Sequence, residues 1–149
     1  MATYSSSVMT NQPRRVHAGV NGVWGTFQMP GTTATSAGDI IQLAKIPNGA
    51  RVIGVACDHS SGSTALGVSY GLATGTTVGG GASYSAFVSA GAQATNLVAL
   101  AGSLPFTISV SDNDPNKYGI FAAKIESGTM TTSVLVNFRV TYEVDQQVN

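Results

Sequence analysis

Apolar and polar residues alternate along a stretch near the C-terminal end of the chain, from Thr131 to Val144 (TTSVLVNFRVTYEV). From Ser133 onward one side of the alternation is apolar and the other is polar, and Leu135 is the one residue that breaks the pattern. Successive side chains of a β-strand point to opposite faces, so this pattern predicts a long strand with one buried and one solvent-facing side. Because such a strand cannot bury its apolar side alone, partner strands and a second sheet are also expected.

Shorter apolar or alternating segments predict the partner strands, and turns rich in Gly, Ser, Thr, Pro and Asn separate them. We expect these strands at 21–29, 39–46, 51–57, 65–72, 104–110 and 117–125. The segment 83–100 fits either two short strands around Gly91, which we favour, or a short helix. Pro47-Asn48-Gly49 is a strong turn signal, and it predicts that the strands on either side form a hairpin. About eight short strands predict an all-β fold, an antiparallel β-sandwich, and we favour a jelly roll.

The chain has the length of one domain, and its first residues differ from the rest. Residues 21–149 are expected to form the sandwich, since no shift in composition marks a second domain. Residues 1–20 show no periodicity and carry Arg14, Arg15 and His17 without an acidic residue. We interpret them as an extended N-terminal arm that orders against a neighbouring subunit, where the two arginines suit carboxylates or phosphates. A solvated tail is the alternative.

Charge is scarce in this sequence. Only 9% of the residues are charged, against a usual fraction of about 25%, and seven basic and seven acidic residues give a formal net charge of zero. Few surface charges mean little repulsion between neighbours, which favours self-association. We interpret the composition as that of a protein whose surface is largely covered by other subunits. The alternative is a secreted or phage-type β-protein with a surface rich in Ser and Thr.

The same numbers argue against several partners. Two arginines in the arm do not make the broad basic patch that nucleic-acid binding requires. No apolar run approaches the roughly 18 residues of a membrane span, and no basic-then-apolar leader opens the chain. We therefore expect no nucleic acid and no membrane as partners. We also expect a protein that is made and kept in a cytosol-like compartment, or one that leaves it by a route other than a signal peptide.

Two segments contain residues that could carry chemistry. Cys57-Asp58-His59-Ser60 combines a thiol, a carboxylate and an imidazole, but neighbours in a strand point to opposite faces, so we interpret it as a strand end. Ser111–Asn116 (SDNDPN) is similar to the start of a calcium loop, yet Lys117 and Tyr118 stand where an EF-hand needs Gly and a ligand. We interpret it as an Asx-type turn, with a different kind of ion site as the alternative.

We predict no enzyme and no cofactor. A single cysteine gives no disulfide framework and no cysteine metal cluster, and two histidines exclude a His-rich metal site.

Two features are candidates for contacts with other subunits. Trp24, the only tryptophan, falls on the face opposite Val23 and Phe27 of its strand. It is either a core residue of a two-sided strand, which we favour, or an interface anchor. Farther along, glycines alternate with a serine, so one face of that strand is flat and another backbone or subunit can approach closely. The residues of this flat face are Gly67, Ser69 and Gly71.

The stretch from Gly38 to Gly71 resembles small structural proteins encoded in the virion gene blocks of tailed bacteriophages. The residues that carry the resemblance are Gly38-Asp39-Ile40, Leu43 with Ile46-Pro47-Asn48-Gly49-Ala50-Arg51-Val52, and Gly67-Val68-Ser69-Tyr70-Gly71. The resemblance implies a jelly-roll or β-sandwich virion component that decorates or cements the capsid surface by binding the major capsid protein and its own copies. It also implies assembly in the host cytoplasm, and a trimer is the oligomer that we expect.

Other positions in a virion remain open alternatives: a head-spike base, a neck component or a tail component. A carbohydrate- or receptor-binding module of a fibre is a further alternative. Such a site requires exposed aromatic rings beside polar groups, and its candidates are Tyr70, Tyr84 and Tyr118.

Overall fold

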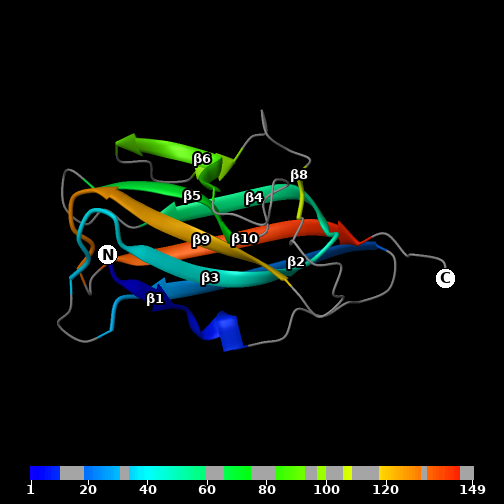
Figure 1. The fold of residues 1–149 in the computed structure, drawn as a ribbon, viewed down its shortest axis with the longest axis horizontal. Coiled ribbons are helices and arrows are strands. Elements are labelled where there is room, and N and C mark those ends of the chain that lie inside the picture. Colours follow the sequence, from blue (N-terminus) through cyan, green and yellow to red (C-terminus); the bar gives the residue numbers. More distant parts are fainter. Residues whose placement is uncertain are drawn as a thin grey trace.

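Two β-sheets packed face to face form the molecule, as the computed structural model shows (Figure 1). The structure describes residues 1–10, 19–30, 34–59, 66–74, 83–92, 97–99, 106–108, 118–131 and 134–144. Sheet A contains, in spatial order, β1 (Thr3–Ser5), β3 (Ile40–Pro47), β9 (Tyr118–Ser127), β5 (Gly67–Thr74) and β6 (Ser83–Ala92). Sheet B contains β2 (Gly19–Gln28), β10 (Leu135–Val144), β4 (Arg51–His59) and β7 (Leu97–Ala99), and β8 (Phe106–Thr107) also pairs with β4. The prediction of an all-β sandwich is confirmed.

The strands pair in a nested order. In antiparallel pairs, β2 lies beside β10, β3 beside β9, β4 beside β7 and β8, and β5 beside β6. Strands β7 and β8 pair with successive parts of β4, so together they occupy one strand position beside β4. Apart from β1, the described strands therefore occupy eight strand positions in the two sheets, which agrees with the expected number of strands. Two strands, β6 and β7, are also present within 83–100 as we favoured, but Gly91 lies inside β6 and does not separate them.

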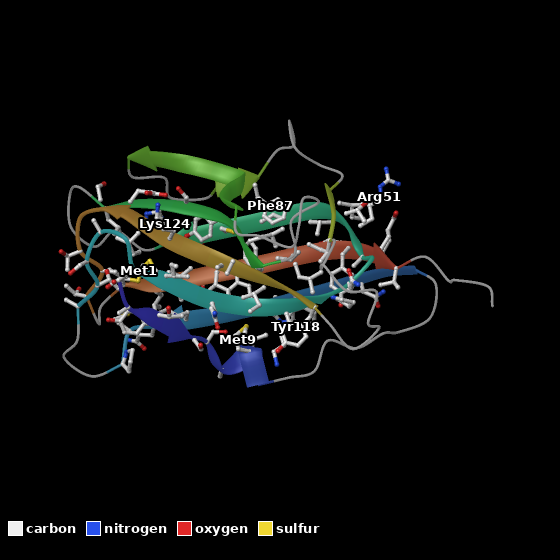
Figure 2. The ribbon with its side chains drawn as sticks, in the orientation of Figure 1. Met1, Met9, Arg51, Phe87, Tyr118 and Lys124 are labelled. Atoms are coloured by element: carbon white, nitrogen blue, oxygen red, sulfur yellow. The ribbon has the colours of Figure 1, made fainter. Side chains whose placement is uncertain are left out.

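Strand β10 is the long alternating strand, and it lies between β2 and β4. Val136, Phe138, Val140 and Tyr142 face sheet A and are buried, whereas Asn137 and Arg139 point to solvent. The core between the sheets contains an aromatic group around Phe121, whose ring centroid lies 5.9–6.4 Å from three others. These neighbours are Tyr70, Phe87 and Phe138, and Figure 2 shows Phe87 near the middle of the molecule.

The hairpin predicted at Pro47-Asn48-Gly49 is wrong, although the turn itself is present. The amide of Ala50 donates a hydrogen bond to the carbonyl of Pro47 at 3.1 Å, and Gly49 has a φ of 80°. A positive φ at the third turn residue is the mark of a type II turn, which splays the flanking strands instead of pairing them. Strands β3 and β4 consequently enter different sheets.

The predicted phase of the returning strand is also corrected at its start. The alternation predicts that Ile53 faces inward with Val55 and Cys57, but 36% of Ile53 is exposed and Val52 is buried instead. The pairing of β4 with β10 shifts register between Thr141 and Tyr142, as at a β-bulge. The extra residue of the bulge turns Ile53 outward.

The first ten residues lie against the sandwich. Strand β1 runs parallel to β3 at the edge of sheet A, and the following 3₁₀ turn η1 (Ser7–Thr10) contacts β3 and β2. Ser6 is buried, and its amide and hydroxyl donate hydrogen bonds to the carbonyls of Gln42 and Leu43 respectively. This segment therefore lies between β3 of sheet A and β2 of sheet B. The other half of the predicted arm includes residues 11–18, which lie outside the described residues.

Gly25 of β2 gives Val8 of η1 room to pack against the core. A Cβ at Gly25 would lie 2.6 Å from a methyl carbon of Val8 and 3.0 Å from the Phe138 ring. We expect Gly25→Ala to lower the free energy of unfolding by about 1–3 kcal/mol, as overpacking does. Adding Val8→Ala should recover part of that loss, which urea unfolding of the single and double variants measures. If the two losses simply add, Val8 does not occupy this site.

Candidate functional site

The outer face of sheet B is the surface of this molecule where exposed apolar side chains collect. Trp24 is 71% exposed and Val20 is 64% exposed on β2, Leu135 is 37% exposed on β10, and Ile53 is 36% exposed on β4. Among the residues whose side chains the structure describes, Met1 is the one other large apolar residue that is exposed. Because a single exposed apolar residue is ordinary but a group on one face marks an interaction site, this face is the candidate functional surface.

The strand register places these side chains in rows across β2, β10 and β4. Trp24 lies opposite Arg139, which lies opposite Ala56. The next row joins Gly22, Thr141 and Gly54, so the surface beside Trp24 is low and flat.

Polar side chains hold one of the rows in place. The hydroxyl of Thr26 donates a hydrogen bond to Asn137 Oδ1 at 2.8 Å, and Asn137 Nδ2 donates to Asp58 Oδ1 at 2.6 Å. At the far end of the face, Arg51 and Glu143 approach to 3.9 Å, an exposed ion pair that contributes little to stability. Figure 2 shows Arg51 toward the end of the molecule away from Met1. The face therefore carries both positively and negatively charged side chains, and hydrogen bonds fix the side chains of one row.

Trp24 is an exposed residue of this face, so the core position that we favoured for it is wrong. Its strand β2 is the edge of sheet B, and nothing among the described residues covers its outer side. The alternative, an interface anchor, stays a prediction. Arg14, Arg15 and His17 lie outside the described residues.

Gly67, Ser69 and Gly71 are buried, so the flat face that we proposed for a neighbouring subunit is already covered within the chain. A Cβ at Gly67 would lie 2.7 Å from the hydroxyl oxygen of Ser127 on the neighbouring strand β9. The hydroxyl of Ser69 donates a hydrogen bond to Glu126 of the same strand at 2.9 Å. Gly67 thus permits a close approach of β9, and the burial of all three residues within the chain argues against them as an interface.

Cys57 and His59 point inward from β4, while Asp58 points outward to Asn137. Burial raises the pKa of the Cys57 thiol, with the Asp58 charge as a second cause, so the thiol stays protonated. His59 is 3% exposed, and its Nδ1 lies 3.4 Å from the hydroxyl of the buried Tyr70. In the described part of the chain, no three His, Cys, Asp or Glu side chains come together as metal ligands would. Ser111–Asn116 lies outside it.

His59 gives the protein a predicted pH dependence. Burial lowers the pKa of His59 below its ordinary value of 6.5, partly offset by Asp58. The unfolded chain then takes up a proton at a higher pH than the folded chain, so the free energy of unfolding falls as pH drops below about 6.5. We expect His59→Gln to show a smaller fall between about pH 7 and pH 5 in urea unfolding. An equal fall in both proteins would show that His59 is not the group responsible.

Sequence reasoning predicted only part of the outer face of sheet B. The alternation of β10 placed Asn137 and Arg139 on a polar side, but their partners Asp58 and Trp24 depend on cross-strand register, which the sequence does not state. In the described residues, no helix has the length and apolarity needed to cross a membrane.

Comparison with known proteins finds likeness in structure alone. No family model matches the sequence, and no curated protein matches it. A chain of the capsid of Ralstonia phage GP4 is similar with a TM-score of 0.72 at 16% identity, covering 97% of this chain and 99% of that one. A chain of the cyanophage Pam1 capsid asymmetric unit has a TM-score of 0.60 at 19% identity, covering 89% and 91%. A chain of the acidic stable capsid structure of Helicobacter pylori bacteriophage KHP30 has a TM-score of 0.48 at 18% identity, covering 87% of this chain and 90% of that one.

Proposed function

We propose that this chain is a non-enzymatic structural protein of a phage virion, which decorates or cements the capsid by binding the major capsid protein and its own copies. The observation that carries the proposal is the shared fold with a chain of the Ralstonia phage GP4 capsid, because it extends over nearly the whole of both chains. The Pam1 capsid chain supports it in the same way. The place we propose is the capsid surface, reached after assembly in the host cytoplasm.

We further propose that the sandwich is a jelly roll. A jelly roll contains eight strands in two sheets, with two Greek keys. The nested pairs of this chain, from β2 with β10 inward to β5 with β6, fit that description, with β1 as an addition at the edge of sheet A. The compact, closed sandwich leaves the outer faces and edges of its sheets as the surfaces for partners.

The chemistry of the inward-facing residues supports a role without catalysis. A nucleophilic cysteine needs a lowered pKa and access to substrate. Cys57 has a raised pKa and is 3% exposed, and its neighbour His59 is equally enclosed. Asp58, the nearby carboxylate, points to the opposite side of the sheet.

One observation favours a carbohydrate-binding module as a second candidate function. Trp24 is an exposed ring beside the polar Asn137 and Asp58 row, which is the kind of surface that sugars bind. The candidate tyrosines fit less well, because Tyr70 is fully buried and Tyr118 lies beneath the Lys45 ammonium at 4.5 Å. The side chain of Tyr84 lies outside the described residues. A glycan screen in which Trp24→Ala removes a hit would support this candidate.

The copy number of the chain in purified virions tests the capsid proposal. Quantitative mass spectrometry should find many copies per particle, in a fixed ratio to the major capsid protein. Mild denaturant should then release this chain while leaving the shells intact. A few copies per virion would instead indicate a head-spike base, a neck or a tail component, and would contradict decoration of the capsid surface.

A further inference from the structure

We propose that the outer face of sheet B binds the same face of a second copy of this chain, across a two-fold axis. The faces of three strands, β2, β10 and β4, would stack on one another as sheets do in a sandwich. This inference takes its setting from the proposed virion role. Its test uses the isolated protein, so its failure can be told apart from a failure to bind capsids.

The first argument is the distribution of exposed apolar side chains. Of the side chains that the structure describes, five large apolar ones are exposed, and four of these lie on this one face, with Trp24 the most exposed of the four. Tryptophan is the residue type most enriched among those that dominate binding energy. An exposed Trp24 ring leaves a large apolar area in contact with water, which is unfavourable in free energy. A sheet packed against it removes that area from water.

The second argument is charge. The face carries two cations, Arg51 and Arg139, and two anions, Asp58 and Glu143, so it is electrically neutral. A strongly basic or acidic partner would leave half of these charges facing a like charge. A second copy of the same face offers both signs in matching number, which is the complementarity that an isologous contact needs.

The strand register shows how the two faces can be matched. A two-fold axis that crosses the strands between the Arg139 and Thr141 rows places each row of one copy on a different row of the other. The Asp58 row then lies on the Arg51 row, so opposite charges meet. Trp24 lies on Gly22 of the second copy, so the largest side chain of the face meets the smallest.

The size of the face limits the area that the contact can bury. Strands of about ten residues at about 3.4 Å per residue and about 4.8 Å apart make a face of roughly 34 by 14 Å. Two copies therefore bury on the order of 1,000 Å², which is the low end for specific protein interfaces. We expect a weak, reversible dimer that becomes populated where copies are concentrated, as on a particle surface. Since it uses one sheet face only, it can also link a trimer to its neighbours.

Trp24 reports on this contact directly, because it is the only tryptophan in the chain. Sedimentation velocity from about 1 µM to about 500 µM should show a monomer becoming a dimer. Over the same range the Trp24 emission should move to shorter wavelength, and its quenching by acrylamide should fall. A monomer throughout the range would overturn the proposal, and so would a dimer in which Trp24 stays fully quenchable.

Charge exchange tests the register. Arg51→Glu and Asp58→Arg should each weaken the dimer about tenfold or more, and the double variant should restore it, because the reversed pair meets again across the axis. Trp24→Ala should raise the dimer Kd by about 30-fold or more. Lys45→Glu, a charge reversal on sheet A, is the matched control and should leave the Kd unchanged. A double variant that dimerises no better than the single variants would contradict the proposed axis.

Discussion

Phe121→Ala is expected to lower the free energy of unfolding by about 3–5 kcal/mol, more than we expect of any other single substitution in this chain. Phe121 is fully buried in β9, and its ring contacts aromatic rings from both sheets. Tyr70 and Phe87 lie on sheet A and Phe138 lies on sheet B, so truncation opens a cavity where the two layers meet. Packed surroundings on all sides cannot collapse fully into that space.

Urea unfolding followed by far-UV circular dichroism measures this loss. Phe121→Leu is the control, because it keeps most of the volume and should cost less than half as much as the alanine variant. A loss below about 1 kcal/mol for Phe121→Ala would mean that the two sheets do not meet at this residue.

Removal of the first ten residues is expected to destabilise the sandwich by about 3 kcal/mol or more. The truncated chain loses the packing of Val8 beside Gly25 and the two hydrogen bonds that Ser6 donates to β3. It also loses the Ala2 amide, which donates a hydrogen bond to Asp39 Oδ1 at 2.6 Å. Asp39 is only 5% exposed, so its carboxylate is left with fewer donors in a place that water reaches poorly.

The pH dependence gives a second reading of the same truncation. Hydrogen bonds from the amides of Ala2 and Ser36 hold the pKa of Asp39 below its ordinary value of 3.8. A lowered folded pKa adds stability above about pH 3.8 that is lost as pH falls through the folded pKa. We expect this acid-side loss to be smaller in the truncated chain, since one of the two donors is gone. An unchanged stability and acid profile would show that the first ten residues do not dock on the sandwich.

This docking changes how the proposed arm should be tested. Truncation of residues 1–20 would combine a loss of stability with any loss of capsid binding. Replacing Arg14 and Arg15 by alanine leaves the docked segment intact, so it isolates the charges that we propose for contact with the major capsid protein. Weaker capsid binding at unchanged stability is the result expected from an arm that acts outside its own subunit.

Sequence reasoning succeeded where one strand's own pattern decides the structure. The alternation in β10 has an unambiguous period, and the structure buries its apolar side as expected. Reasoning failed where a second strand decides. The Pro47-Asn48-Gly49 turn looks alike in a hairpin and in a crossing between sheets, and only the partners of β3 and β4 distinguish them. The glycine at position 67 likewise predicts that another part of a protein approaches closely, but it does not show whether that part is β9 or another subunit.

Trp24 shows the same limit at the candidate surface. Strand phase correctly placed it opposite Val23 and Phe27, but whether that side is covered depends on what packs outside sheet B. A sequence pattern predicts which residues share a face of a strand, but it does not predict what packs against that face. The interaction surface could therefore be recognised only once the sheets were assembled.

The measurement that tests the central proposal most directly is co-sedimentation of the purified protein with empty phage capsids, taken from the phage that we propose as its source and stripped of this chain. We predict saturable binding with a fixed ratio of bound chains to major capsid protein, and competition between labelled and unlabelled protein. Folded protein that stays in the supernatant at saturating concentration would contradict a role on the capsid surface.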